Sequence, residues 1–334
     1  MLEEKKPHIG ITIGDINGIG PEIILKTLSI ADLSKSIPVV FAPSGVLEHY
    51  NRELSLNCNI TVVDETPSLQ ENTIHVYPLP DSPLKITTGS LTREGGKAAM
   101  LSIDEAIRHT MRGLTDAIVT APISKEAVNL AGYNIPGHTE YLAKHTHTDT
   151  VVMMLVNKKL RVALATTHVP VKDIVADLNP ELLTSKIRVL HKSLTLKFGI
   201  SNPKIAVFGL NPHAGDGGVI GLEEIELIQP VIEKLNHEGL NLHGPFPADG
   251  FFGQKLHKEF NAIFAMYHDQ GLVPFKLLSF GKGVNFTAGL PIIRTSPDHG
   301  TAYDIAGKGV ANPSSFKEAY NLAVHLAQKR INGK

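Results

Sequence analysis

The sequence predicts an α/β protein with mostly parallel, buried strands. Short β-branched runs recur along the chain and alternate with longer amphipathic stretches. Apolar runs in such an alternation are typical of strands that are covered by helices. At 334 residues the chain also exceeds the length at which one hydrophobic core usually stops growing. We therefore expect two lobes.

The individual elements follow from these patterns. The predicted strands are 9–13, 38–42, 117–120, 151–155, 162–165, 205–208 and 262–266. The main predicted helices are 95–112, 180–198 and 222–237, each long enough for three or more turns. A further helix is expected to begin at Pro21.

The composition excludes several classes of protein. With 42% apolar and 19% charged residues, the chain resembles an ordinary soluble globular protein. A formal charge of −1 without a long basic run argues against nucleic acid or a membrane surface as a partner. The single cysteine, Cys58, fits a reducing compartment, and no apolar run approaches the roughly 20 residues of a membrane span. Because the first residues do not resemble a signal peptide either, we expect a cytoplasmic protein that acts on a small molecule.

The segment GDINGIGPE, residues 14–22, places three glycines between a predicted strand and a predicted helix. This context can hold phosphate at a helix N-terminus. The spacing G-x-x-x-G-x-G, however, fits neither the dinucleotide fingerprint G-x-G-x-x-G nor a P-loop. We therefore predict that Gly14, Gly18 and Gly20 form a tight strand-to-helix turn, which borders a cofactor cleft at most.

Three histidines follow three predicted strands, in VALATTHVP, IAVFGLNPHAG and AIFAMYHDQG. They are His168, His213 and His268. Because ligands of open α/β sheets bind outside the carboxyl ends of parallel strands, these imidazoles are expected to face one region. Neutral imidazoles without thiolates suit Zn²⁺, Co²⁺ or a similar divalent ion, and three protein ligands leave room for a substrate. Each histidine could equally be a hydrogen-bonded structural residue, so the residues alone leave both interpretations open.

Polar residues in two further segments predict an anion site. Lys276 and Arg294 flank Asn285 in an apolar, glycine-rich part of the chain, where they could bind a phosphate together. In GHTEYLAKH, His138 and Thr139 precede a helical pattern, where backbone N–H groups can also meet an anion. Solvated surface charges would explain the lysine and the arginine as well, and a helix cap would explain the threonine.

The segment DHGTAYDIAGKGVANPSS, residues 298–315, has little apolar periodicity and closely spaced glycines. Such a pattern predicts a loop that surrounds a ligand. In a nucleotide-binding loop, an acidic residue can accept hydrogen bonds from ribose hydroxyls and repel a 2′-phosphate. Asp304 is the candidate for this role.

Over essentially its whole length the chain resembles the 4-hydroxythreonine-4-phosphate dehydrogenase family of the vitamin B6 pathway. The resemblance rests on motifs that occur in the family's order: GIGPEI, TAPISKEA, GHTEYLA, LATTHVP, GLNPHAG, GPFPAD, YHDQGLVPFK and DHGTAYDIAGKG. It implies the NAD-dependent oxidation of the C3 hydroxyl of 4-phosphooxy-L-threonine. The resulting β-keto acid would then lose CO₂ to give 3-amino-2-oxopropyl phosphate.

The resemblance also implies roles for individual residues. The positions of the family's divalent-metal ligands are those of His168, His213 and His268, and the ion could be zinc, cobalt, magnesium or manganese. The positions of its substrate-binding residues are those of His138, Thr139, Lys276, Asn285 and Arg294. Near this chemistry, Asp249 and Asp269 could orient a ligating histidine or move a proton, and Lys276 could supply a proton to the enolate. The identity of the general base stays open.

The two ends of the chain, GIGPE and HGTAYDIAGKGVANP, also resemble isocitrate and isopropylmalate dehydrogenases. This wider resemblance implies a two-lobed α/β/α fold that is not a Rossmann fold, with the active site in the cleft between the lobes. His299 and Asn312 would then contact the adenine and Asp304 the ribose, which favours NAD over NADP. It further implies a homodimer in which both chains contribute to each active site.

Possible hinges after residues 120–125 and near 271–274 suggest where the lobes divide. We expect a first lobe of residues 1–125 and 272–334, which includes the adenosine-binding segment. The second lobe, residues 126–271, would carry metal ligands and dimer contacts.

One departure from the family and three alternatives remain. Ile16-Asn17 stands where the family usually has Pro-Ala, which leaves the glycine spacing intact. Close relatives of the family oxidise 4-phospho-D-threonate or 4-phospho-D-erythronate, so the configuration of the substrate is open. A metal-dependent hydrolase with three histidine ligands would need no NAD and would leave residues 298–315 without a purpose. A regulator that only binds a metabolite would not need a metal centre beside an anion pocket.

Overall fold

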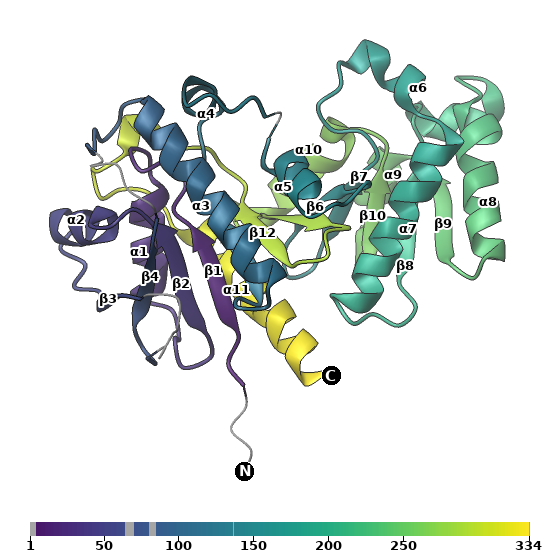
Figure 1. The fold of residues 1–334 in the computed structure, drawn as a ribbon. Coiled ribbons are helices and arrows are strands. Elements are labelled where there is room, and N and C mark those ends of the chain that lie inside the picture. Colours follow the sequence, from purple (N-terminus) through teal and green to yellow (C-terminus); the bar gives the residue numbers. More distant parts are fainter. Residues whose placement is uncertain (1–4, 64–69, 80–84, 136, 334) are drawn as a thin grey trace. The chain divides into compact units, whose positions relative to one another are not determined.

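The structure is a computed structural model that describes residues 5–63, 70–79, 85–135 and 137–333. The chain divides into two compact units. The first unit comprises Met1–His147 and Leu290–Lys334, and the second comprises Thr148–Gly289. Each unit contains a sheet with helices packed against it (Figure 1).

The first unit contains a parallel sheet in its described residues. Its strands are β1 (His8–Thr12), β2 (Ile37–Ala42), β3 (Ile60–Val62), β4 (Ile74–Pro78), β5 (Ala117–Thr120) and β12 (Arg294–Pro297). They lie in the order β3-β4-β2-β1-β5-β12, and each neighbouring pair is parallel. The carboxyl ends of all these strands therefore lie at one edge of the sheet.

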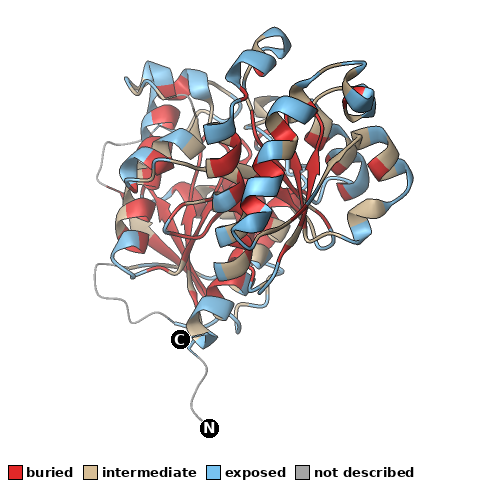
Figure 2. Ribbon diagram, turned by 90° about the vertical axis from the view of Figure 1, so that its right-hand side faces the viewer, coloured by how far each residue is buried: buried red, intermediate tan, exposed pale blue. Residues whose placement is uncertain are grey.

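Helices cover both faces of this sheet. They are α1 (Gly20–Leu28), α2 (Val46–Glu53), α3 (Arg93–Met111), α4 (Lys125–Leu130), α5 (His138–His145) and α11 (Ser314–Asn332). Helix α3 packs on one face, whereas α1 and α11 lie together on the other (Figure 1). Every residue of β2 and β5 is buried, as expected of strands between two helical layers, and Figure 2 shows the strands in the colour of buried residues.

Local chemistry sets where several of these helices begin. The hydroxyls of Thr92 and Ser124 accept hydrogen bonds from the backbone N–H groups of Gly95 and Ala127, which caps α3 and α4. Gly14 has a φ of +71°, and a Cβ there would lie 2.4 Å from the carbonyl oxygen of Pro122. The predicted tight turn between β1 and α1 therefore requires glycine at this position.

The second unit contains a mixed sheet in its described residues. Its strands are β6 (Val152–Val156), β7 (Arg161–Leu164), β8 (Lys204–Phe208), β9 (Asn241–Phe246), β10 (Ala262–Ala265) and β11 (Val284–Ala288). They lie in the order β11-β6-β7-β10-β8-β9. Strand β6 is antiparallel to both β11 and β7, and the remaining pairs are parallel. The carboxyl ends of β7, β10 and β8 thus lie side by side.

The helices of the second unit are α6 (Ile174–Asp177), α7 (Pro180–Leu196), α8 (Gln229–His237), α9 (Ala248–Gly253) and α10 (His268–Ser279). The helix expected at 222–237 begins instead with a π-helical turn, Glu224–Ile228. Pro230 lies two residues after this turn and has no N–H to donate to the carbonyl of Glu226, which is consistent with the interruption of regular α-helical hydrogen bonding. The buried core includes aromatic residues from β8 and α9, among them Phe208 and Phe251.

The boundaries between the units lie later in the chain than the expected divisions after residues 125 and 271. Tyr141 of α5 donates a hydrogen bond of 2.6 Å to Asp104 of α3, which ties the segment after residue 125 to the first unit. Asn157, after β6, donates a hydrogen bond of 3.0 Å to Ser279 at the end of α10. Since β11 also pairs with β6, α10 and β11 belong to the second unit.

None of the described helices is both long and apolar enough to cross a membrane. The cytoplasmic location stays a prediction.

Candidate functional site

Two of the three histidines predicted to bind metal lie close together in the second unit. His168 follows β7 by four residues, and His268, the first residue of α10, follows β10 by three. Because β7 and β10 are parallel neighbours, their carboxyl ends bring these side chains to the same edge of the sheet. The centroids of the two imidazole rings are 6.4 Å apart.

The environment of His268 fits a metal ligand. Its Nδ1 atom lies 2.7 Å from Oδ1 of Asp269, so Nε2 is the ring nitrogen that faces other partners. A carboxylate on the second nitrogen holds the ring orientation and makes a ligating histidine more basic, which is typical of metal sites in proteins. The structure thus gives Asp269, one of the predicted catalytic residues, a contact that suits orienting His268.

His213 lies in an unusual turn, Pro212–Gly218, that follows β8. Its φ and ψ are 53° and 24°, and Ala214 and Asp216 also have positive φ values. Each such non-glycine residue costs about 1–2 kcal/mol, so other contacts must hold the turn. Within the described part of the chain, no group of three His, Cys, Asp or Glu side chains is placed to hold a metal ion. Binding of one ion by all three histidines therefore stays a prediction.

Asp249, the other predicted catalytic carboxylate, lies exposed in the first turn of α9.

Arg294 is the most buried of the residues predicted to bind substrate. It begins β12, is 2% exposed, and donates from Nε and Nη2 to the hydroxyl of Thr120, at 3.1 and 2.7 Å. Burial lowers the pKa of Arg294 to about 10. The negative charge of Glu140 partly opposes this decrease. The guanidinium therefore stays charged at neutral pH and offers a buried positive charge to an anion.

His138 and Thr139 form the start of α5, in the same unit as Arg294. The Nε2 atom of His138 is buried and has no hydrogen-bond partner among the described residues. Burial, and to a lesser extent the charge of Arg294, lowers the pKa of His138 to about 3. A neutral imidazole with an unsatisfied buried nitrogen is suited to hydrogen-bond a ligand.

The two remaining substrate candidates belong to the second unit. Lys276 is exposed on α10, and Asn285 lies on β11 with a buried Oδ1 that lacks a hydrogen-bond partner among the described residues. The orphaned oxygen of Asn285 is a second buried polar atom that a ligand could satisfy.

The three residues predicted to bind the cofactor lie on one loop, between β12 and α11. The side chains of His299, Asp304 and Asn312 are all exposed. Asn312 Oδ1 accepts a hydrogen bond from the backbone N–H of Ser314, which leaves its amide nitrogen directed elsewhere. An imidazole, a carboxylate and an amide on one exposed loop fit the adenine and ribose of a dinucleotide.

The glycine-rich turn is bound to this loop. Ile19 donates its backbone N–H to the carbonyl of Thr301 at 2.9 Å, and a Cβ on Gly18 would lie 2.9 Å from the same oxygen. Tyr303 donates a hydrogen bond of 2.6 Å to the fully buried Asp15. Burial raises the pKa values of both side chains. The turn thus supports the backbone of the predicted cofactor loop, and sequence reasoning did not identify Asp15 or Tyr303.

Helix α1 holds the other end of the loop. Glu22 is completely buried and accepts a hydrogen bond from the backbone N–H of Ala311 at 2.8 Å. Lys26, paired with Glu22 at 2.7 Å, donates to the carbonyls of Gly309 and Ala311. The i, i+4 spacing of the glutamate and lysine was a signal in the sequence, but only the fold shows their common target.

Asn17, part of the departure from the family pattern, links three segments. Its side chain donates to the hydroxyl of Thr92 and accepts from the backbone N–H of Thr87, at 2.9 and 2.8 Å. Its carbonyl accepts from the N–H of Gly89. The amide therefore ties the glycine-rich turn to the chain that precedes α3.

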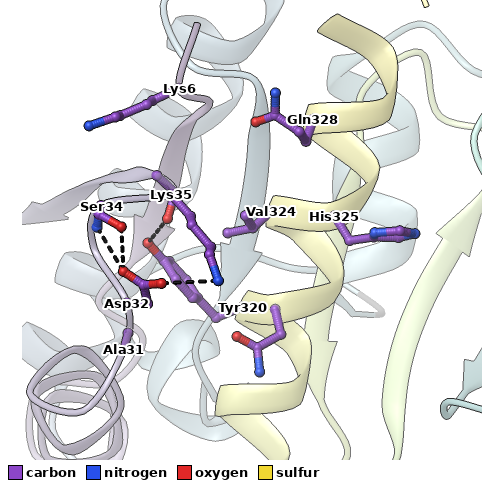
Figure 3. A pocket seen from close by; sticks show the side chains of 11 residues that line it. Lys6, Ala31, Asp32, Ser34, Lys35, Tyr320, Val324, His325 and Gln328 are labelled. Atoms are coloured by element: carbon purple, nitrogen blue, oxygen red, sulfur yellow. Dashed lines mark hydrogen bonds and ion pairs between the residues drawn. The ribbon is translucent and has the colours of Figure 1, made fainter. Parts of the chain in front are cut away.

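A cavity of about 510 Å³ lies elsewhere in the first unit, before the amino end of β2 and along α11 (Figure 3). Ser36 and Tyr320, whose hydroxyls are 2.9 Å apart, line it together with Lys35 and His325. Because it contains none of the predicted site residues, we do not assign it to the candidate site.

Comparison with known proteins defines the class first. The chain is similar to the crystal structure of 4-hydroxythreonine-4-phosphate dehydrogenase from Klebsiella pneumoniae, with 40% identity and a TM-score of 0.86. The match covers 96% of this chain and 100% of that one. The predicted α/β fold is thereby confirmed as the fold of such dehydrogenases.

The sequence comparisons give the family. A 4-hydroxythreonine-4-phosphate dehydrogenase from Bacteroides thetaiotaomicron is 43% identical over 331 residues, 98% of this chain and 91% of that protein. A protein from Oceanobacillus iheyensis, provisionally named D-threonate 4-phosphate dehydrogenase, is 42% identical over 97% of this chain and 98% of its own length. The family model described as pyridoxal phosphate biosynthetic protein PdxA matches residues 34–323. The chain belongs to the PdxA family.

Proposed function

We propose that this protein is an NAD-dependent 4-hydroxythreonine-4-phosphate dehydrogenase of pyridoxal phosphate biosynthesis. It oxidises the C3 hydroxyl of 4-phosphooxy-L-threonine, after which the β-keto acid loses CO₂ to give 3-amino-2-oxopropyl phosphate. NAD accepts the hydride, and the proton lost from the hydroxyl is balanced by the one that replaces CO₂ on carbon. The observation that carries the proposal is 43% identity over 98% of the chain to a protein of that name.

The predicted metal ligands support the oxidative step. His168, His213 and His268 would hold one divalent cation, Zn²⁺, Co²⁺, Mg²⁺ or Mn²⁺, and Asp269 would orient His268 through the 2.7 Å contact. The bound ion would supply Lewis acidity, which lowers the pKa of the substrate hydroxyl and stabilises the negative charge that develops as CO₂ leaves.

The buried polar groups support recognition of the phosphorylated substrate. Arg294 offers a charged guanidinium from the end of a strand, and neutral His138 offers an unsatisfied ring nitrogen. Thr139, Lys276 and Asn285 complete the proposed set of substrate-binding residues. Arginine recognises the planar or tetrahedral oxygens of carboxylate and phosphate by paired hydrogen bonds, whereas lysine contributes a point charge.

Binding of NAD is assigned to the loop between β12 and α11. In the proposal, His299 and Asn312 contact the adenine, and Asp304 accepts hydrogen bonds from the ribose hydroxyls. The carboxylate would repel the 2′-phosphate of NADP, so that NAD is preferred.

Proton transfer is assigned to a small set of groups. Lys276 or Asp249 would move protons at the reacting carbon and oxygen, and either role requires a side chain within hydrogen-bond reach of the substrate. Both side chains are exposed on their helices, so solvent and small molecules can reach them.

We also propose a homodimer whose active sites combine residues of both chains. Mixing a His213→Ala variant with a Lys276→Ala variant tests this arrangement. If each site draws on both chains, the verified heterodimer regains part of the activity that both parents have lost. A heterodimer as inactive as its parents would contradict shared sites.

The decisive experiment follows NADH absorbance with 4-phosphooxy-L-threonine as substrate. We expect NADH to form in metal-replete protein and to cease after chelation, with recovery when Zn²⁺ or Co²⁺ is restored. Absence of NADH with this substrate and with its D-configured relatives would overturn the proposal. Release of inorganic phosphate without NAD would instead indicate a metal-dependent hydrolase.

A second candidate differs only in the substrate. The candidate substrate is 4-phospho-D-threonate. It is supported by the relative from Oceanobacillus iheyensis, which is 42% identical to this chain, compared with 43% for the relative from Bacteroides thetaiotaomicron. 4-Phospho-D-erythronate is tested in the same assay. The ratio of kcat/KM values among the three compounds decides between the candidates.

A further inference from the structure

A buried carboxylate lies beneath the turn that carries His213. Glu224, in the π-helical turn before α8, is 3% exposed. Its Oε1 accepts hydrogen bonds from the backbone N–H groups of Leu210 and Asn211, at 2.6 and 2.8 Å. Its Oε2 accepts a third bond, of 2.9 Å, from the side-chain amide of Asn211. The charge is therefore surrounded by N–H donors at the point where β8 ends.

One glycine just before the turn and one within it lie directly against this carboxylate. A Cβ on Gly209 would lie 2.8 Å from Oε1 of Glu224, and one on Gly215 would lie 2.7 Å from Oε2. The backbone between them follows the left-handed course of His213 and its neighbours. The carboxylate thus lies on the inner side of the turn. Three non-glycine residues of this turn, His213, Ala214 and Asp216, have positive φ values, which are unfavourable unless other contacts stabilise them.

We propose that Glu224 is a positioning residue that holds His213 in the conformation required to bind the divalent cation. This inference rests on the proposed function, because it assumes that His213 is a metal ligand. Hydrogen bonds to a buried carboxylate are stronger than those between neutral groups, so Glu224 can hold a strained backbone that neutral partners would release. Glu224 does not itself contact the metal or the substrate in this scheme.

The chain offers a graded set of variants. Glu224→Ala removes all three acceptor contacts. Glu224→Gln keeps one acceptor oxygen for the two backbone N–H groups but turns an NH₂ group toward the Asn211 amide, where two donors meet. Glu226→Gln changes an exposed glutamate of the same π-helical turn and serves as the matched control.

The primary measurement is a calorimetric titration of metal-free full-length protein with Co²⁺, together with the visible spectrum of the bound ion. We expect Glu224→Ala to weaken Co²⁺ binding by about 100-fold and Glu224→Gln by about 10-fold, with a changed spectrum, because support of a metal ligand is typically worth 10- to 100-fold in affinity. Glu226→Gln should bind as the wild type does. NAD affinity should be unchanged in all three variants, a pattern that general loss of stability would not produce.

Hydrogen exchange in the metal-free protein gives an independent readout. Peptides that cover residues 209–218 should exchange faster in Glu224→Gln, with the rest of the second unit unchanged. If Glu224→Ala does not fold, Glu224→Gln carries the test alone. Wild-type affinity, spectrum and exchange in a folded Glu224→Gln variant would overturn the proposal. A wild-type protein that binds no Co²⁺ would instead overturn the metal site of the proposed function.

Discussion

The substrate candidates Arg294 and His138 of the first unit differ from the metal candidates of the second unit in how far their side chains are exposed. In the first unit, Arg294 is almost completely buried and the ring nitrogen of His138 is enclosed. In the second unit, His168 and His213 are exposed, and His268 is 39% exposed while it contacts an even more exposed aspartate. The buried substrate candidates Arg294 and His138 are therefore held in place without a ligand, whereas the exposed metal candidates of the second unit need other partners to bring them together. The exposed cofactor candidates of the first unit, and Asn285 of the second unit with its buried Oδ1, do not follow this difference.

This difference suggests that the buried groups recognise the substrate and the exposed imidazoles bind the metal ion. Groups buried before the ligand arrives require no reorganisation on binding, which favours recognition of a fixed feature such as a phosphate. Exposed imidazoles at strand ends can adjust to a metal ion, whose bonds then supply the order. Buried carboxylates support the backbone in both units, through Asp15 and Glu22 in the first and Glu224 in the second.

The largest effect is expected from the buried cation of the first unit. Replacing Arg294 by Met should reduce kcat/KM for the phosphorylated substrate by about 1000-fold, or about 4 kcal/mol, because the hydroxyl of Thr120 and the substrate both lose a charged donor. Arg294→Lys, which keeps the charge without the fork, should recover only part of this loss. Steady-state kinetics measure both, and Arg188→Met, at an exposed ion pair, is the control.

The comparison would fail if Arg294→Met also abolished Co²⁺ binding in a folded protein. Such a result would mean that substrate recognition by Arg294 and metal binding by the histidines are not separate functions.

A smaller effect is expected at the exposed metal candidates. Asp269→Asn removes the carboxylate that faces Nδ1 of His268 and should weaken Co²⁺ or Zn²⁺ binding by about 10- to 100-fold. Asp177→Asn alters an exposed aspartate of the same unit and should change nothing. Competition with a coloured chelator measures both affinities. Equal affinities in Asp269→Asn and wild type would show that Asp269 does not orient a ligand.

A still smaller effect, confined to the dinucleotide, is expected from the support of the predicted cofactor loop. Lys26→Met removes the donor to the carbonyls of Gly309 and Ala311 and should raise the Kd for NAD by about 10-fold, since each bond to a charged donor contributes about 1.5–3 kcal/mol and part of this loss falls on stability. The control is Lys35→Met, which removes an exposed lysine paired with Asp32. Unchanged NAD affinity in a folded Lys26→Met variant would argue against a role for α1 in the loop.

The last effect concerns stability alone, and it is expected in the pH dependence of unfolding. Because the folded pKa of His138 is lowered to about 3, the unfolded chain binds a proton between about pH 6.5 and pH 3 that the folded protein does not. This contribution to stability is present above pH 6.5 and is lost as the pH falls toward 3, by up to about 1.4 kcal/mol per pH unit. His138→Gln should show a shallower decline of its urea midpoint from pH 6.5 to pH 4.5. Parallel profiles for the variant and the wild type would contradict the lowered pKa.

The sequence predicted the short apolar strands well and did not predict several others, although β12 among the latter is fully buried. Seven strands lie within one or two residues of predicted runs, because each is a short apolar segment; they are β1, β2, β5, β6, β7, β8 and β10. Strands β4, β9 and β12 contain His, Pro, Gly or Arg, which lower the intrinsic preference for strands. Their backbones pair because neighbouring strands supply hydrogen bonds, a condition that no local pattern contains.

The candidate site shows the same limit. His168 and His268 each follow a predicted strand. Their proximity can be predicted only when these two strands, β7 and β10, are known to be neighbours in the sheet. The roles of Asp15 and Glu224 could not be predicted, because their partners lie far along the chain or depend on the course of a turn. Their signal was weak, since an acidic residue near a turn is most often a solvated one.

The sequence by itself determined the α/β class, the family and the chemical character of the candidate residues, because periodicity, motif order and side-chain type are all written along the chain. The tertiary structure decided which groups are buried and which backbone they support. In the sequence, Arg294 could not be distinguished from a surface arginine, whereas in the structure β12 places it beside Thr120. The glycine-rich turn supports a loop that is almost 300 residues away in the sequence. Burial and long-range contacts depend on how strands neighbour one another, and that order is a property of the whole fold.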